Sequence, residues 1–474
     1  MAANKFSFFL AILLYLATSE FCVASPNFIL ILADDQGWNG TSISMSRDRN
    51  DARSDFFQTP NLERLAHRGM RFTQGYSPAA LCSPTRRSIQ FGQTPTRQGQ
   101  ERFAANYPTT TKKLTIPRAL KAVNPAYRAA HFGKWDLRTD LLPEHLGYDV
   151  SDGNTGNGDG NRGSNFSKID KWLKHKTLED PKQIFGITRR ATDFIEEQVA
   201  AGRPFFIQVS HYAVHADTQT RPESLATHQG REKGKVHHRA AFAGMTSDLD
   251  AGVGLLLDKL DELGIADSTY VIYTADNGAV PWMPPNKPKH FGHPSQFKDV
   301  SRNHPLRGGK WTLLEGGIRV PLIVSGPGVA AESFCEIPVV GWDFLPTIAD
   351  LAGYRAALPP DLDGGSFRDV LENEGHGSVS RPTPALVFHR YSAGYPHTAI
   401  HSGGYKLIKF WKRPPFNNDT NRQGAGKYSD TLLFDLKNDL GELESQTEEL
   451  PKKVRHLEGI LMRYLQDVSA EVSK

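Results

Sequence analysis

Cysteine is scarce in this 474-residue sequence, which contains only Cys22, Cys82 and Cys335. So few cysteines exclude the dense disulfide framework that stabilises small secreted domains, and a sizeable hydrophobic core has to hold the fold instead. A single bridge between Cys82 and Cys335 stays open as an alternative. Because free thiols are uncommon outside the cytosol, the position of Cys82 needs its own explanation.

An excess of charge of one sign is also nearly absent. Lys and Arg number 56 and Asp and Glu number 52, which gives a formal net charge of +4. The sequence has no run of basic residues beyond scattered pairs, so we expect no nucleic-acid partner. The weak positive charge is compatible with a small anionic substrate.

Long apolar runs are limited to the N-terminus, where FSFFLAILLYLA follows Lys5 and precedes TSEFCVAS. A basic start, an apolar centre and a small-residue exit are typical of a signal peptide, and the run is too short to span a bilayer comfortably. We expect residues 1–24 to be removed after Ala24, with no membrane association afterwards. A retained N-terminal anchor is the alternative. The expected location is periplasmic or secreted.

Elsewhere, short apolar runs alternate with amphipathic stretches. Uninterrupted apolar runs suit strands that are covered on both faces, and the amphipathic stretches suit helices. We therefore predict an α/β fold in which helices sandwich a large mixed, mostly parallel sheet. The expected strands cover 27–33, 127–132, 204–210, 269–275 and 320–326, and the expected helices cover 59–72, with Thr59 as cap, and 245–264.

The sequence pattern changes near residue 380. Short strands are predicted in ALVFHRYS, YKLIKFW and TLLFDL, followed by a polar helix over 448–469. We predict a catalytic domain over 25–379 and a C-terminal α+β subdomain over 380–474, with a small antiparallel sheet and a helix. The tract 151–165, rich in Gly and Asn, is predicted to be a loop, either a wall of the site or a flexible linker.

Polar residues follow directly on several predicted strands. Parallel strands bind ligands beyond their carboxyl ends, so these side chains are expected to converge. Asp34, Asp35, Asp276 and Asn277 form an oxygen-only set that suits Ca²⁺ or Mg²⁺, and three crowded carboxylates repel each other without a cation. The alternative is a set of separate helix caps and turns. Lys134, His211 and His215 also follow strands.

Cys82 lies in the turn LCSPTRRS, just before Pro84, which favours the first turn of a helix. A helix N-terminus favours a bound anion, and Arg86, one turn later, can point back toward the cysteine. The thiol could be an activated thiolate, although no dedicated histidine accompanies it.

At this point the sequence resembles the type I, formylglycine-dependent sulfatases, in particular bacterial arylsulfatases. CSPTR fits their Cys-x-Pro-x-Arg signature. The other segments that look like family segments, in the family's order, are NFILILADDQGWNG, TPNLERLAHRGMRFTQGYS, HFGKW, YAVHAD, TADNG, LRGGKWTLLEGGIRVPLIVSGPG and DTLLFDLKNDLGE. The resemblance covers about Asn27 to the end and implies an alkaline-phosphatase-like fold.

The resemblance also implies chemistry. A maturing enzyme would oxidise Cys82 to Cα-formylglycine, whose hydrate attacks the sulfur of a sulfate monoester and then expels sulfate through its second hydroxyl. One Ca²⁺ would be held by Asp34, Asp35, Asp276, Asn277 and modified residue 82. Arg86 would steady the hydrate, Lys134 and Lys310 would bind sulfate oxygens, and His215 would be the candidate general acid. His211 ranks below His215 for that role.

One departure from the family concerns Asp136. The family usually reads GKWH, but this sequence reads GKWD. A carboxylate can also accept a proton, but it adds negative charge beside an anionic intermediate. The alternative is that Asp136 points away from the site.

We therefore predict a sulfatase that acts on a sulfated saccharide or aryl sulfate. The alternatives are a phosphate or phosphonate monoester hydrolase of the same superfamily, and a degenerate sulfatase that only binds anionic glycans. The loops around 151–165, 281–305 and 390–425 are expected to select the substrate, and His237, His238, His290 and His293 are expected in a substrate loop or on the surface rather than in a zinc site.

Overall fold

The computed structural model describes residues 25–99, 112–138, 140–164, 166–167, 170–281, 302–391, 396–412 and 429–472. The predicted signal peptide, His290, His293 and large parts of two expected substrate loops lie outside the described residues.

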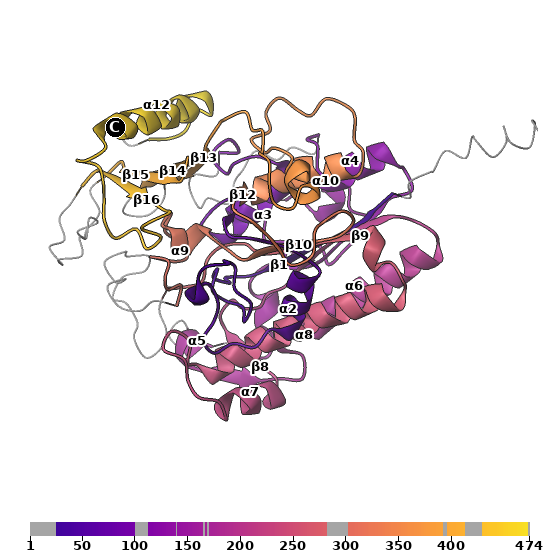
Figure 1. Ribbon diagram of the computed structural model, residues 1–474. Helices are drawn as coiled ribbons and strands as arrows, with labels where there is room; N and C mark the ends of the chain where they lie inside the picture. Colours follow the sequence, from indigo (N-terminus) through magenta and orange to yellow (C-terminus); the bar gives the residue numbers. More distant parts are fainter. Residues whose placement is uncertain are drawn as a thin grey trace, which may run out of the picture.

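An eight-stranded sheet forms the centre of the protein (Figure 1). Within it only β10 runs antiparallel to its neighbours, so the predicted mixed, mostly parallel sheet is confirmed. In spatial order its strands are β11 (Ser333–Cys335), β2 (Gly69–Phe72), β10 (Leu322–Ser325), β9 (Thr269–Ala275), β1 (Asn27–Ala33), β7 (Phe205–Ser210), β4 (Arg128–Gly133) and β5 (Val150–Ser151).

Helices cover both faces of this sheet, which explains why its central strands are apolar throughout. The side chains of β1 alternate between two cores: Ile29 and Ile31 belong to one, and Phe28 and Leu30 to the other. The first core packs against α2 (Pro60–His67), α6 (Ile184–Ala200) and α8 (Ala240–Glu262), and the second against α3 (Cys82–Phe91), α4 (Ile116–Val123) and α10 (Phe344–Leu351). Figure 1 shows α2, α6 and α8 below the sheet and α4 and α10 above it.

The predicted helix over 59–72 is wrong in its second half. The helix ends at His67, and residues 69–72 form β2. Gly69 allows the strand to approach β10, because a Cβ at this position would lie 2.2 Å from the Val324 carbonyl oxygen. Thr59 precedes the helix but makes no side-chain cap.

The C-terminal region contains a four-stranded antiparallel sheet, as predicted, although β14 was not anticipated. One face of this sheet packs against Tyr76, Leu313 and Trp342, and the other face is covered by α12 (Pro451–Asp467) through Ile400, Leu407 and Leu461. In Figure 1, α12 lies above this sheet at the upper left. Its strands are β13 (Leu386–Arg390), β14 (His397–Ser402), β15 (Tyr405–Phe410) and β16 (Thr431–Asp435).

The described chain also contains shorter strands and α-helices. They are β3 (Gly75–Tyr76), α5 (Asp170–Leu173), β6 (His175–Thr177), β8 (Thr218–Thr220), α7 (Pro222–Gln229), α9 (Glu315–Ile318), β12 (Val339–Val340) and α11 (Arg368–Glu372).

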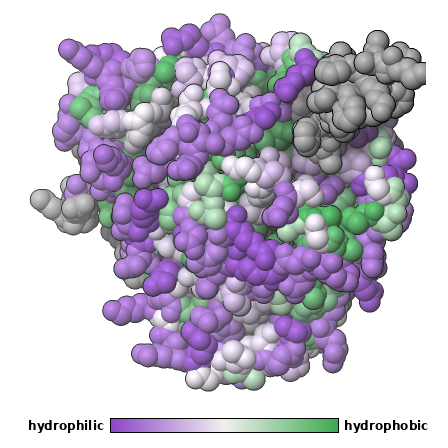
Figure 2. Space-filling view, turned by 45° about the vertical axis from the view of Figure 1, so that its right-hand side comes forward, coloured by the Kyte–Doolittle hydropathy of each residue, from purple (hydrophilic) through white to green (hydrophobic). Residues whose placement is uncertain are grey.

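The surface is mostly hydrophilic on the face drawn in Figure 2, with hydrophobic patches between polar side chains. Among the described residues one helix, α8, is long and apolar enough to cross a bilayer, but 78% of its apolar window is buried inside the protein. We therefore interpret α8 as a core helix.

Candidate active site

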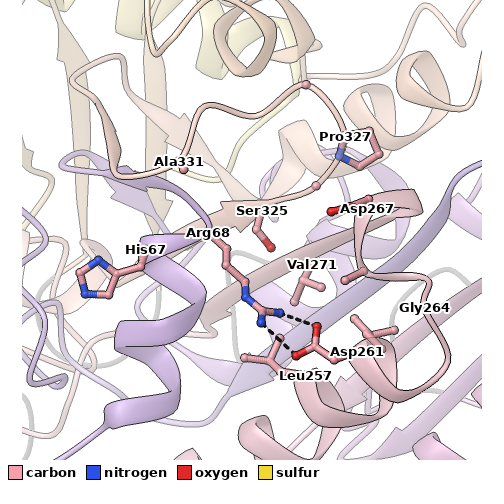
Figure 3. A pocket seen from close by; sticks show the side chains of 14 residues that line it. His67, Arg68, Leu257, Asp261, Gly264, Asp267, Val271, Ser325, Pro327 and Ala331 are labelled. Atoms are coloured by element: carbon pink, nitrogen blue, oxygen red, sulfur yellow. Dashed lines mark hydrogen bonds and ion pairs between the residues drawn. The ribbon is translucent and has the colours of Figure 1, made fainter.

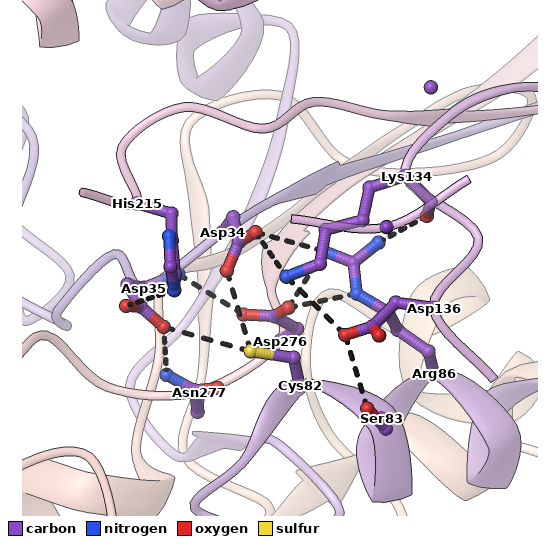
Figure 4. Close-up of polar contacts among 12 residues, drawn as sticks. Asp34, Asp35, Cys82, Ser83, Arg86, Lys134, Asp136, His215, Asp276 and Asn277 are labelled. Carbon is purple, nitrogen blue, oxygen red and sulfur yellow. Dashed lines mark hydrogen bonds and ion pairs between the residues drawn. The ribbon is translucent and has the colours of Figure 1, made fainter. Parts of the chain in front are cut away.

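The predicted polar residues converge at one edge of the large sheet (Figure 4). The strand registers align the carboxyl ends of β1, β9, β7 and β4, because Ala33 pairs with Ala275 and Gly133 with Ser210. Asp34 and Asp35 follow β1, Asp276 and Asn277 follow β9, Lys134 follows β4 and His215 follows β7. Cys82, the first residue of α3, lies at the same edge.

Four buried side chains form a cluster that could hold a metal ion. One ligand atom each from Asp34, Asp35, Cys82 and Asp276 lies within 4.8 Å of all the others. The Oδ1 atom of Asn277 is buried and has no hydrogen-bond partner in the described part of the chain. A buried acceptor of this kind is costly unless a cation takes it, so the donor set fits a hard, oxygen-preferring ion.

Backbone contacts hold the cluster together. The Asp35 amide donates to Asp276 Oδ1 at 3.1 Å, and the Asp276 amide donates to the Ala33 carbonyl. Asp35 has a φ of 59°, a conformation that Asp tolerates better than most residues. The residue after Asn277 is Gly278. A Cβ at this position would lie 1.9 Å from the Gly316 carbonyl oxygen, so only glycine lets these two turns approach each other.

Three buried cations surround the carboxylates. Lys134 Nζ lies 2.6 Å from Asp34 Oδ2, and Lys310 Nζ lies 2.6 Å from Asp35 Oδ1. Arg86 donates from Nε and Nη2 to Asp276 Oδ2 at 3.0 and 2.7 Å. Each of the three carboxylates therefore has a cationic side-chain partner, which offsets part of the repulsion expected among them.

Cys82 lies between these opposite charges. Its thiol donates to Asp34 Oδ1 at 3.6 Å, and Lys310 Nζ approaches the sulfur at 3.3 Å. Burial raises the pKa of the Cys82 thiol, and the two lysines do not compensate for this. The thiol is therefore a poor nucleophile as it stands. Cys82 and Cys335 are both free, so the bridge left open by the sequence is not formed.

Burial also affects the acids and bases around Cys82. Burial acts to raise the pKa of Asp34, but Lys134 and the other nearby cations outweigh it and lower the pKa. Burial and the charge of Asp34 raise the pKa of Asp276. Attraction to Asp34 overcomes burial at Lys134 and raises its pKa, so this ammonium stays charged.

His215 faces the cluster, whereas His211 does not. The Nδ1 atom of His215 lies 2.5 Å from the Ala216 carbonyl oxygen, and its Nε2 atom lies 3.7 Å from Asp35 Oδ2. Burial and the nearby Lys310 lower the pKa of His215 to about 4. His211 is fully buried, and its ring approaches the position that a Cβ on Gly252 of α8 would take.

Asp136 points into the site rather than away from it (Figure 4). Its Oδ2 atom accepts a hydrogen bond from Ser83 Oγ at 3.1 Å and lies 3.6 Å from Lys134 Nζ. Arg138 Nε donates to its other oxygen at 3.3 Å. Two cations thus offset the negative charge that the Asp136 carboxylate brings.

Sequence reasoning missed several residues near the site. Ser83 directly follows Cys82, and its position in the CSPTR motif could have indicated that it lies near the site. Lys182 is buried and donates to Asn161 Oδ1 at 2.6 Å, but nothing in its sequence context indicated this. His237 is also buried, with Nδ1 2.9 Å from Ser54 Oγ, so it does not lie on the surface, and its place in a substrate loop stays a prediction.

A separate hollow of about 780 Å³ lies at the other end of β9 (Figure 3). Val271, near the start of β9, lines it, whereas the cluster follows the end of that strand. Its Arg68 is paired with Asp261 at 2.8 and 2.9 Å. The Arg68 cation in this hollow is thus already neutralised. None of the residues that line the hollow belongs to the cluster.

Comparison with known proteins assigns this chain to a family. The sequence matches the family described as Sulfatase over residues 26–354, and the family described as N-sulphoglucosamine sulphohydrolase, C-terminal, over residues 309–468. The chain belongs to the sulfatase family. As a sulfatase it is a sulfuric ester hydrolase, and the residues that form its buried cluster all lie within the first match.

Relatives of this sulfatase share most of its length. It is 29% identical to arylsulfatase A of Bos taurus, over 93% of this chain and 88% of the relative. It is 31% identical to N-acetylgalactosamine-6-sulfatase of Canis lupus familiaris, over 81% of this chain and 72% of the relative. Its fold resembles that of Ps i-CgsB, solved in complex with k-i-k-neocarrahexaose, with a TM-score of 0.71, 23% identity and coverage of 93% and 92%.

Proposed function

We propose that this sulfatase hydrolyses sulfate monoesters of saccharides by S–O cleavage, using formylglycine derived from Cys82 and one Ca²⁺. The observation that carries the proposal is the position of Cys82. It is the first residue of α3, and its sulfur lies 3.6 Å from Asp34 Oδ1, 4.0 Å from Asp35 Oδ1 and 3.3 Å from the Lys310 ammonium, which itself contacts Asp35.

The residues fit both groups. Asp34, Asp35, Asp276 and the unpartnered Asn277 oxygen would hold the ion. When present, Ca²⁺ supplies positive charge that favours an ionised oxygen at residue 82, and the formylglycine hydrate supplies the second hydroxyl through which sulfate leaves. The protein's own side chains bind the sulfate and move the protons.

Lys134 and Lys310 are the residues that we propose to bind the sulfate oxygens. Their ammonium groups now pair with Asp34 and Asp35, which are the carboxylates that a metal requires. Once those carboxylates serve a metal, both ammonium groups can donate to sulfate, and their charge stabilises the negative charge that develops during S–O cleavage. Arg86, held between Asp276 and the Lys134 carbonyl, would steady residue 82.

His215 is the residue that we propose to protonate the leaving oxygen. A carbonyl only accepts, so the short contact with Ala216 requires a proton on Nδ1 and leaves Nε2 facing the site. Burial and Lys310 keep the free imidazole neutral. A bound sulfate ester offsets the Lys310 charge, raises the pKa of His215 and so prepares Nε2 to carry the proton that the leaving group takes.

We propose that Asp136 accepts a proton from residue 82. Its carboxylate is hydrogen-bonded to Ser83, the residue that follows Cys82. A base at this position can take the proton of the second hydroxyl as sulfate is released. Lys134 and Arg138 offset the charge that made a carboxylate unfavourable here.

The names of similar proteins support a saccharide substrate. One relative is an N-acetylgalactosamine-6-sulfatase, and the solved structure named above contains a neocarrahexaose. We also propose that a formylglycine-generating enzyme matures the chain and that the protein acts in the periplasm or outside the cell. The second of these proposals rests on the N-terminal sequence pattern.

The test combines mass spectrometry with kinetics. The full chain is co-expressed with a formylglycine-generating enzyme, and the peptide that contains residue 82 is analysed. We expect an aldehyde at residue 82, turnover of an aryl sulfate in preference to the matched aryl phosphate, and no turnover by Cys82→Ala. An intact thiol in active protein would overturn the proposal. A preference for phosphate would favour the phosphatase alternative, and sulfate binding without turnover the degenerate one.

A further inference from the structure

The segment that carries Lys310 is built against the C-terminal sheet. It runs from Arg307 to Ile318 and contains the short helix α9. On the side of the site, the Lys310 amide donates to the Ala279 carbonyl at 3.1 Å and the Trp311 amide donates to the Ala80 carbonyl at 2.9 Å. On the other side, Leu313, Leu314 and Ile318 share one core with Phe388 and Ile408 of the C-terminal sheet.

Glu442 holds both ends of this segment. Its carbonyl oxygen accepts from Arg307 Nη1 at 2.8 Å, and its carboxylate accepts from the Glu315 amide at 2.7 Å. Arg307 and Glu315 flank Lys310, and the loop between them is closed where the Gly316 amide donates to the Arg307 carbonyl at 2.8 Å. Glu442, which lies outside the segment, thus contacts both sides of a loop that its own backbone hydrogen bond closes.

Lys406 of β15 completes the anchor. Its Nζ atom lies 2.9 Å from Glu315 Oε1 and 2.9 Å from Glu442 Oε1, and all three side chains are fully buried. Glu315 also accepts from Tyr76 and Arg319 at 2.9 and 3.2 Å. Buried charges with this many partners have little freedom to move, because any displacement leaves a desolvated charge unpaired.

We propose that Glu442 and Lys406 are positioning residues that set the place of the Lys310 ammonium, so that the C-terminal region forms part of the sulfate-binding apparatus. The inference rests on the proposed role of Lys310 in binding sulfate. It extends that role to two residues that lie far from Lys310 in the sequence and do not touch the substrate.

The main test variant is Lys406→Met combined with Glu442→Leu. It removes one positive and one negative charge and leaves Glu315 paired with Arg319 and Tyr76, so the buried cluster stays neutral and the protein is expected to fold. The matched control is Lys409→Met. Lys409 lies on the same strand with its side chain on the opposite face, where it pairs with Glu458 of α12 at 2.8 Å.

Two quantities are measured on the matured full chain: the dissociation constant of inorganic sulfate by calorimetry, and kcat/KM for an aryl sulfate. For the double variant we expect the sulfate dissociation constant to rise about tenfold and kcat/KM to fall about 10- to 100-fold, because small displacements of a binding group are costly. Lys409→Met should match the wild type in both quantities. The single variant Glu442→Gln keeps an acceptor for the Glu315 amide, so it should retain most of the wild-type sulfate affinity.

A merely structural role would lower the melting temperature of the double variant without changing the sulfate affinity of its folded fraction, and that result would overturn the inference. The variant Lys310→Met distinguishes a failure of the proposed sulfate-binding role of Lys310 from a failure of the positioning role. If Lys310→Met binds sulfate as tightly as the wild type, the proposed role of Lys310 is wrong. If Lys310→Met binds weakly but the double variant binds normally, only the positioning role is wrong.

Discussion

Lys182 has an unusual environment among the charged residues of this protein. It is 1% exposed, and within the described residues it makes no ion pair with a carboxylate. Its Nζ atom donates to Asn161 Oδ1, which also accepts from the Asp217 amide. Burial lowers the pKa of Lys182 to about 7, although Asp217 opposes the shift. The charged form is therefore costly in the folded state.

Replacing Lys182 by Met should stabilise the protein. A depressed lysine pKa means that the unfolded chain binds the proton more tightly between about pH 7 and pH 10.5, so wild-type stability rises with pH over this window. The Met variant lacks this dependence. We expect a gain of about 1–3 kcal/mol at pH 6 that shrinks toward pH 10. Urea unfolding at both pH values measures it, with exposed Lys174→Met as the control. A variant less stable than the wild type at pH 6 would contradict this account.

Asp136→Asn tests the proton-accepting role of the carboxylate. The amide keeps an oxygen that can accept from Ser83 but cannot take up a proton, so kcat should fall about 10²- to 10³-fold while KM changes little. Steady-state kinetics on an aryl sulfate measures both. Ser83→Ala, which removes only the hydrogen bond, should lose far less activity. Equal losses in the two variants would indicate that Asp136 only orients its neighbour.

Residues that follow a strand could be predicted from the sequence, and residues placed by tertiary contacts could not. Asp34, Asp276 and Lys134 follow recognisable apolar runs, so the sheet topology alone brings them to one edge. The burial of Lys182 depends instead on how the 152–164 loop packs on residues near Asp217, and no local pattern encodes such a contact.

At the scale of elements, α2 begins with a cap that comes from another helix. The carboxylate of Asp250 in α8 accepts from the Asn61 and Leu62 amides at 3.0 and 2.8 Å, at the start of α2. These amides have no partner within α2 itself. The sequence pointed to Thr59 because it precedes Pro60, whereas the Thr59 hydroxyl interacts with Ser42.

Asp250→Ala should therefore destabilise the protein by about 1–2 kcal/mol, the usual cost of a lost N-terminal cap. Asp258→Ala is the matched control, because Asp258 lies on the same helix and contacts α2 through an exposed ion pair with Arg64 at 2.6 Å. Exposed pairs contribute less than about 1 kcal/mol. Thermal unfolding compares the two variants, and a larger loss in Asp258→Ala would refute the capping role.

Long, fully apolar strands such as β1 and β9 were predictable because both of their faces are buried. β2, β11 and β14 were not, because their short segments lack a decisive period and are defined by pairing with distant strands. The antiparallel direction of β10 likewise depends on its partners, β9 and β2.

For the whole molecule, calcium should link the ends of two neighbouring strands, β1 and β9. Asp34 and Asp35 follow β1, whereas Asp276 and Asn277 follow β9, so a shared ion stabilises the folded state only. We expect saturating Ca²⁺ to raise the stability of the wild type by about 2–4 kcal/mol and EDTA to reverse the gain. Asn277→Leu should lose most of this response and Asn277→Asp should keep it. Thermal unfolding with and without Ca²⁺ decides, and an unchanged response in Asn277→Leu would exclude the site.

The enclosure of Cys82 has a consequence for how the enzyme is made. Only 4% of this residue is exposed, beneath strand ends and loops that come from distant parts of the chain. The modifying enzyme that we propose would reach such a thiol only while the chain is still nascent or extended. Maturation and folding would then compete in time, and on this proposal a molecule that folds first would keep its thiol and stay inactive. The yield of active enzyme would then depend on the relative rates of maturation and folding rather than on an equilibrium between two states.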